Sequence, residues 1–154
     1  MNDKPTPEET LVWQRRLASQ ANNRAWTLAE ALQRTPAEDE EMLQAAHAAM
    51  YLWNMAGNDR NRALAALLVA HACALLGMGE PAARFLAKSQ SLTMPDGAAP
   101  WELALVHAVV ANVAAVNADG PAHRLHYRKA HELVAQLPDP EDRSILEATL
   151  RVLP

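Results

Sequence analysis

Two glycines, Gly79 and Gly120, lie 41 residues apart, and each stands between an alanine-rich apolar run and an amphipathic run that carries basic residues. The same step relates five further pairs of similar positions: Ala70 and Ala111, Leu86 and Tyr127, Lys88 and Lys129, Ser89 and Ala130, and Leu92 and Leu133. A helical hairpin that recurs at a fixed interval hides its apolar faces by stacking on its neighbours. The spacing therefore predicts stacked antiparallel helical hairpins.

The composition favours closely packed helices over sheets. Half of the residues are hydrophobic but only 5% are aromatic, and the one isoleucine is Ile145. Alanine, about one residue in five, has the highest helix propensity. The valine-rich stretch 106–113 lies inside a longer alanine-studded segment, which indicates a buried helix. We expect an all-α fold, and 154 residues suit a single domain spanning residues 1–154.

Two helix starts are marked by a threonine, a proline and a glutamate three residues after the threonine. These are Thr6-Pro7-Glu8-Glu9 and Thr35-Pro36-Ala37-Glu38. Such a threonine caps the helix, the proline fits its first turn and the glutamate completes a capping box. The first helix is expected to continue to Gln33 along an apolar stripe, and the second to end at Gly57.

Capping residues, prolines and glycines predict five more helices. Asp59 is predicted to cap a third helix that reaches Gly77, and Pro81 to lie in the first turn of a fourth. A linker at 93–100 precedes a fifth helix from Trp101, and a sixth is expected over 121–137. The clearest repeat pair covers 58–137, the segment 138–154 would be a capping helix, and residues 1–5 are expected to be flexible.

The hairpins resemble those of tetratricopeptide (TPR) repeats. In that family a small residue in the first helix faces a small, bulky and small residue in the second. Here the pattern consists of Ala70 with Ala82, Leu86 and Ser89, and again of Ala111 with Tyr127 and Ala130. The resemblance implies a short TPR-like α-solenoid or bundle that binds peptides or partner proteins along a concave face. The second unit departs from the pattern at His123, and the 41-residue step exceeds the usual one of about 34.

Two polar residues occupy one repeat position inside apolar helices. His71 and Asn112 are separated by one full step, so they should face the same way. Because leaving either of them buried without a partner costs on the order of 1–3 kcal/mol, they should either share a buried hydrogen bond or line one inner surface. The second alternative predicts a binding groove bordered by His71, Asn112 and the aromatic residues Tyr51 or Trp53. Tyr51 and Trp53 could equally be core residues.

The predicted sixth helix carries the chain's concentration of cationic residues. Arg124, Arg128 and Lys129 lie there among three histidines. This basic face could meet an anionic partner, or it could be an ordinary solvated surface.

Three histidines, His47, His71 and His107, lie in three apolar segments of the chain. Neighbouring helices could bring their imidazoles together as a zinc site, which gives an alternative interpretation as a small metal- or ligand-binding protein. Their unequal distances from the glycine that ends each hairpin arm argue against a shared level. The preferred prediction therefore includes no metal and no cofactor.

Charge and motifs favour a binding protein over an enzyme. The net charge of −4 gives no reason to expect nucleic acid as a partner, and no apolar run is long enough to predict a membrane span. The single cysteine, Cys73, suggests a reducing, cytoplasmic setting. No nucleophile or phosphate-loop motif is present. We expect a non-enzymatic protein- or peptide-binding module that forms homo-oligomers, as a dimer.

Overall fold

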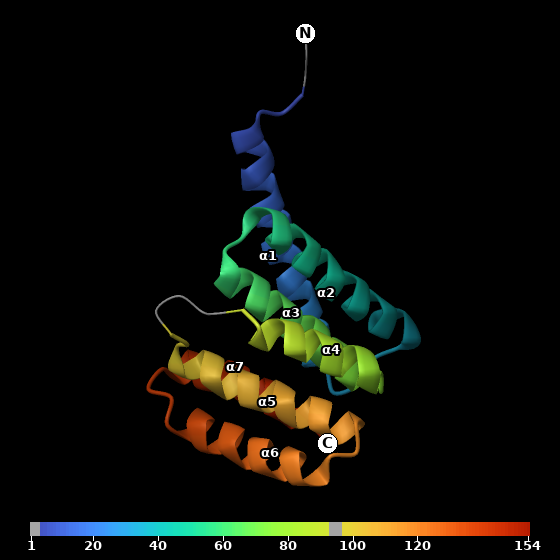
Figure 1. Cartoon of the computed structure of the whole chain (residues 1–154), viewed down its shortest axis with the longest axis vertical. Coiled ribbons are helices and arrows are strands. Elements are labelled where there is room, and N and C mark those ends of the chain that lie inside the picture. Colours follow the sequence, from blue (N-terminus) through green and yellow to red (C-terminus); the bar gives the residue numbers. More distant parts are fainter. Residues whose placement is uncertain (1–3, 93–96) are drawn as a thin grey trace.

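Helices joined by short turns make up the chain in a computed structural model that describes residues 4–92 and 97–154 (Figure 1). Within those residues the elements are α1 (Pro7–Ala29), α2 (Pro36–Ala56), α3 (Asp59–Leu75), α4 (Gly79–Gln90), α5 (Pro100–Val116), α6 (Gly120–Ala135) and α7 (Pro140–Arg151), with no strand. The predicted all-α class and the expected number of helices are thereby confirmed.

Both predicted capping boxes are present. The Thr6 hydroxyl accepts a hydrogen bond from the Glu9 amide at 3.2 Å, and the Glu9 carboxylate accepts one from the Thr6 amide at 2.8 Å. Thr35 and Glu38 repeat the arrangement at 3.2 and 2.7 Å. These bonds satisfy amides that an α-helix leaves free at its first turn, so α1 and α2 begin where the sequence predicts.

Some helix boundaries differ from those expected. The cap of α3 is Asn58 rather than Asp59, because the Asn58 side chain accepts from the Asn61 amide at 3.0 Å. The first helix ends at Ala29 instead of Gln33. Helix α4 begins at Gly79, so Pro81 lies in its first turn as predicted. Of the expected flexible N-terminus, residues 1–3 lie outside the described part of the chain. Residues 93–96 of the predicted linker lie outside it as well.

The helices pair in sequence as α1/α2, α3/α4 and α5/α6, and α7 packs on α5 and α6. Helix α3 lies between α1 and α5 and contributes a large share of the core, with almost every residue from Ala63 to Ala74 buried. The Ser89 hydroxyl donates to the Ala63 carbonyl at 2.8 Å and holds α4 close against α3. Small side chains on both helices permit this close approach.

Helices α3 and α5 run parallel with a constant offset. Asn112 Nδ2 lies 3.1 Å from His71 Nδ1, 41 residues apart, and Arg60 Nε lies 2.6 Å from Glu102 Oε1, 42 residues apart. Two bonds near opposite ends of the helices fix their direction and register. The first helices of two successive hairpins thus stack side by side at the interval seen in the sequence.

The ends of α3 and α5 also match after one step. Gly77 has φ +73° and Ala118 has φ +60°, the left-handed conformation that closes a helix. In both turns the amide of the following residue donates a hydrogen bond of 2.9 Å to a carbonyl in the last turn of the helix. Met78 donates to Cys73, and Asp119 donates to Ala114. The 41-residue repeat therefore extends to individual backbone hydrogen bonds.

Replacing Ala118 with glycine should raise the free energy of unfolding by about 0.5–1 kcal/mol, because alanine is strained at positive φ and glycine is not. The matched change Gly77→Ala should lower it by a similar amount, since a Cβ at Gly77 would meet no atom within 4 Å and only the backbone conformation opposes it. Urea unfolding of the two variants measures both effects. Equal stabilities for wild type and Ala118→Gly would show that the turn at Ala118 is not strained.

Candidate functional site

The residues of the predicted groove do not form one exposed surface. His71 and Asn112 are buried and meet in a hydrogen bond with 3.1 Å between Nδ1 and Nδ2. Of the two alternatives that the sequence left open, the buried bond is the one observed. His71 has no exposed surface, so its predicted place in a groove wall is wrong. Tyr51 is exposed, and Trp53 borders a separate depression beside Asn61.

Burial keeps the His71 imidazole neutral. Desolvation, aided by the positive charge of Arg34, lowers the pKa of His71 to about 4. Its Nε2 atom has no hydrogen-bond partner among the described residues, so an added proton would gain no acceptor there. The Trp26 ring packs against His71 with 5.4 Å between ring centroids. His71 thus supports an aromatic side chain that belongs to a cleft.

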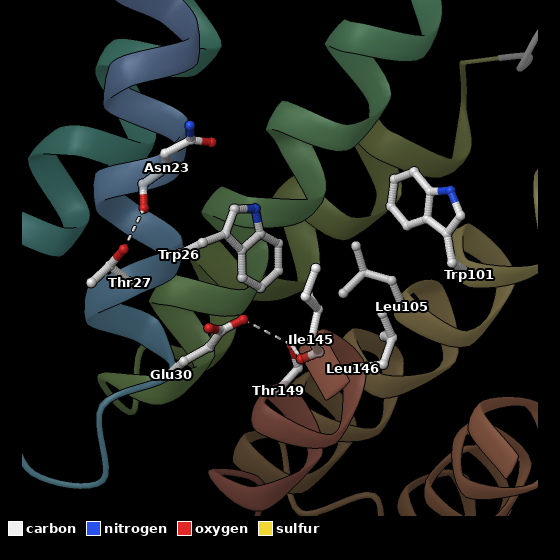
Figure 2. Close-up of a pocket in the computed structure, with 9 residues that line it drawn as sticks. All are labelled: Asn23, Trp26, Thr27, Glu30, Trp101, Leu105, Ile145, Leu146 and Thr149. Carbon is white, nitrogen blue, oxygen red and sulfur yellow. Dashed lines mark hydrogen bonds between the residues drawn. The ribbon is translucent and has the colours of Figure 1, made fainter. Parts of the chain in front are cut away.

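That cleft, of about 300 Å³, lies between α1, α5 and α7 (Figure 2). It is lined by Asn23, Trp26 and Thr27 of α1 and its C-cap Glu30, by Trp101 and Leu105 of α5, and by Ile145, Leu146 and Thr149 of α7. Five of these side chains are aromatic or aliphatic. Binding sites in proteins have this character, a mostly apolar concavity with a few polar groups.

Helical periodicity explains why these residues converge. Four of them follow the i, i+3, i+4 and i+7 pattern along α1, from Asn23 to Glu30, and so share one face of that helix. Trp101 and Leu105 are four residues apart on α5, as are Ile145 and Thr149 on α7. Each helix therefore presents a short stripe, and the cleft forms where three stripes meet.

Glu30 is the one ionisable residue among the nine that line the cleft. Desolvation raises the pKa of its half-buried carboxyl, although a hydrogen bond from Thr149 and the charge of Arg151 act in the opposite direction. The Thr149 hydroxyl donates to Glu30 Oε1 at 3.4 Å, as Figure 2 shows. A partly desolvated carboxylate in a cleft whose lining includes Trp26 favours a cationic group.

Nothing in the sequence singled out Trp26, Trp101 or Glu30. A usable signal is the one-turn spacing of Trp26 and Glu30, which puts an indole and a carboxylate together on one face. The contribution of α7 had no such signal, because Glu30 and Thr149 are 119 residues apart in the chain.

The histidine alternative is wrong in its geometry. His47 packs on Phe85 at 5.4 Å between ring centroids, His71 packs on Trp26, and His107 Nδ1 lies 2.8 Å from His126 Nδ1. The three imidazoles thus have different neighbours. In residues 4–92 and 97–154, no three histidine, cysteine, aspartate or glutamate side chains are arranged to hold a metal ion.

The predicted basic face lies on the outside of α6. Arg124, Arg128 and Lys129 are exposed, and Lys129 Nζ is 3.9 Å from the Glu132 carboxylate. Two of the nearby histidines turn toward α5 instead, since His123 Nδ1 lies 3.0 Å from the Ala111 carbonyl oxygen and His126 meets His107. The three cations and the imidazoles of His123 and His126 therefore occupy different sides of the helix.

No helix in the described part of the chain has the length and apolarity needed to cross a bilayer. The cleft and the basic face are two features of the described surface that could meet another molecule. Comparison of the chain with protein-family models, with curated proteins and with solved structures finds no match among any of the three.

Proposed function

We propose that this chain is a non-enzymatic, TPR-like helical-repeat module that binds a peptide segment of a partner protein in the cleft between α1, α5 and α7. The observation that carries the proposal is the cleft itself, with two tryptophans and three aliphatic side chains around about 300 Å³. That volume is at the lower end of about 300–1,000 Å³ for small-molecule sites. It suits one anchoring side chain of a peptide.

The position of the cleft supports the TPR-like part of the proposal. Eight of the nine lining residues lie in odd-numbered helices, which are the first helices of their hairpins and α7, and Glu30 caps α1. The resemblance to TPR repeats implies peptide binding along a concave face. A reducing compartment such as the cytoplasm suits the free, buried thiol of Cys73, whose pKa is raised by burial.

The chemistry of the cleft defines the peptide. An aliphatic or aromatic side chain would fill the space between Trp26, Trp101 and Ile145, and desolvation of these apolar groups would supply most of the affinity. Next to it, a lysine or arginine would approach Glu30. The expected ligand is therefore a segment in which an apolar residue neighbours a basic one.

Selection from a random peptide library should enrich such apolar–basic pairs, and Ile145→Asp should weaken the selected peptides about tenfold or more. Ile145 is half exposed at the cleft, so the change places a charge in the site without disturbing the core. Leu125→Asp, an equally exposed leucine on α6, is the matched control and should bind as wild type does. Calorimetric titration gives the affinities. Selected peptides that bind Ile145→Asp and wild type equally would contradict the proposal.

The basic residue of the peptide should be recognised only while Glu30 is ionised. Since the pKa of Glu30 is raised above its ordinary 4.5, affinity should fall as the pH drops through that raised value and the carboxylate takes up a proton. Glu30→Gln should bind more weakly at neutral pH and show little pH dependence over the same range. Fluorescence titrations of a lysine-containing peptide and of its norleucine analogue separate the charge effect from the apolar contact. Equal pH profiles for wild type and Glu30→Gln would rule out the ion pair.

A further inference from the structure

The N-terminal part of α1 projects beyond the other helices, as Figure 1 shows. Helix α2 covers α1 only as far as Arg15, whose Nε donates to the carbonyl of Ala56 at 3.0 Å, and Ala56 is the last residue of α2. We call residues 7–17 the α1 arm. Its large apolar side chains are Leu11, Val12, Trp13 and Leu17, and each is 40–57% exposed.

The arm is apolar on more than one side. Leu11, Val12 and Trp13 are consecutive, so they point in directions about 100° apart around the helix. Leu17 extends the Trp13 side by one turn. A surface helix normally keeps its outer faces polar, and an arm with apolar groups on several sides is typical of a helix that another element covers.

The charges of the arm indicate what covers it. Glu8 and Glu9 lie at its start, and Arg15 and Arg16 lie seven residues later. The midpoint of this pattern is Val12, next to Trp13. A second arm laid antiparallel across that midpoint would bring its arginines to the glutamates of the first, and its glutamates to the arginines. The pattern is thus complementary to itself under a two-fold axis.

Local contacts agree with this pairing. The Arg16 guanidinium lies over the Trp13 ring at 5.5 Å, which places its charge at the centre of the exposed apolar surface. Glu8 is exposed at the first turn of the helix.

We propose that a second copy of this chain covers the arm, through antiparallel pairing of two α1 arms about a two-fold axis near Trp13. The apolar surface of Trp13 and its neighbours is shared between the copies, and two reciprocal Glu8–Arg16 pairs fix the direction. The pairing is independent of the cleft between α1, α5 and α7. Failure of the peptide-binding test would not affect the proposed pairing, and failure of the dimerisation test would not affect the proposed peptide binding.

Sedimentation velocity across a concentration series tests the pairing. Wild type should show a monomer–dimer equilibrium below about 1 mM, and Trp13→Glu should be monomeric with an unchanged circular dichroism spectrum. Leu125→Glu, which puts the same charge on an exposed leucine of α6, should dimerise as wild type does. A monomeric wild type, or a dimer that survives Trp13→Glu, would overturn the proposal.

Charge reversal tests the direction of pairing. Glu8→Arg and Arg16→Glu should each raise the dimer dissociation constant about tenfold, because each makes two like-charged pairs. An equimolar mixture of the two variants should recover the affinity of wild type, since every pair in the mixed dimer is again opposite in charge. Glu9 and Arg15 are left unchanged because they bond to Thr6 and Ala56. A mixture that remains as weak as the separate variants would exclude the antiparallel register.

Discussion

Replacing Arg60 with alanine is expected to lower the free energy of unfolding by about 2–3 kcal/mol, which is a large part of the stability of a domain of this size. The Glu102 side chain has no exposed surface, and its Oε1 atom lies 2.6 Å from Arg60 Nε. Without the guanidinium, a buried carboxylate would keep only its bond from the Ala99 amide, at 2.7 Å. The side chain of Arg60 is 39% exposed, and partial access of water keeps the loss below the largest values known for buried pairs.

Chemical unfolding of a double-mutant cycle checks the origin of this loss. Glu102→Gln retains an oxygen for the Ala99 amide but removes the charge, so adding it to Arg60→Ala should restore part of the stability. Arg62→Ala is the matched control on the same helix. Arg62 pairs with the exposed Asp59, and its loss should cost less than about 1 kcal/mol. If Arg60→Ala and Arg62→Ala are equally mild, the pair that joins α3 to α5 contributes little.

Acidification from pH 6.5 to about 4 should remove about 3 kcal/mol of stability through His71 alone. The pKa of His71 is about 4 in the folded chain against 6.5 for the unfolded one, so in this interval the unfolded state binds more protons. Stability is therefore complete above pH 6.5 and declines as the pH falls. Burial also lowers the pKa values of His47 and His107, which adds smaller losses in the same direction.

Urea unfolding at a series of pH values measures this dependence. His71→Gln has no imidazole to titrate and keeps polar atoms for Asn112, so its stability should change much less between pH 6.5 and 4. His47→Gln is the control and should retain most of the slope, since His47 is only partly buried. Identical slopes for wild type and His71→Gln would mean that His71 does not remain neutral in the fold.

The parts of the fold that the sequence predicts are those determined by short stretches of chain. A capping box involves only the N-cap residue and the residue three positions later, so the starts of α1 and α2 were predicted correctly. The 41-residue step was readable from pairs of similar residues such as Gly79 and Gly120, whereas the turn shared by Gly77 and Ala118 appears only in the structure. The start of α3 was missed because Asn58 and Asp59 are both good caps, and only the bond to Asn61 distinguishes them.

The candidate site depends on contacts that no local pattern contains. Whether His71 and Asn112 would meet or face solvent depends on how closely α3 and α5 approach, and the small residues around them allow contact. The cleft exists because α7 returns to α1, bringing Thr149 to Glu30. The exposure of Trp13 likewise follows from where α2 ends relative to α1, at Ala56. The apolar stripe of α1 is buried only farther along the helix, at Ala25 and Leu28.

The indole N–H signals of the four tryptophans test the central proposal most directly, since Trp26 and Trp101 line the cleft and the other two lie elsewhere. In a ¹H–¹⁵N titration of the uniformly labelled protein with a selected apolar–basic peptide, we expect the signals of Trp26 and Trp101 to shift and to saturate together. The signals of Trp13 on the α1 arm and of Trp53 should stay in place. Saturable shifts at Trp53 or Trp13, with none at Trp26 and Trp101, would contradict the assignment of the cleft as the binding site.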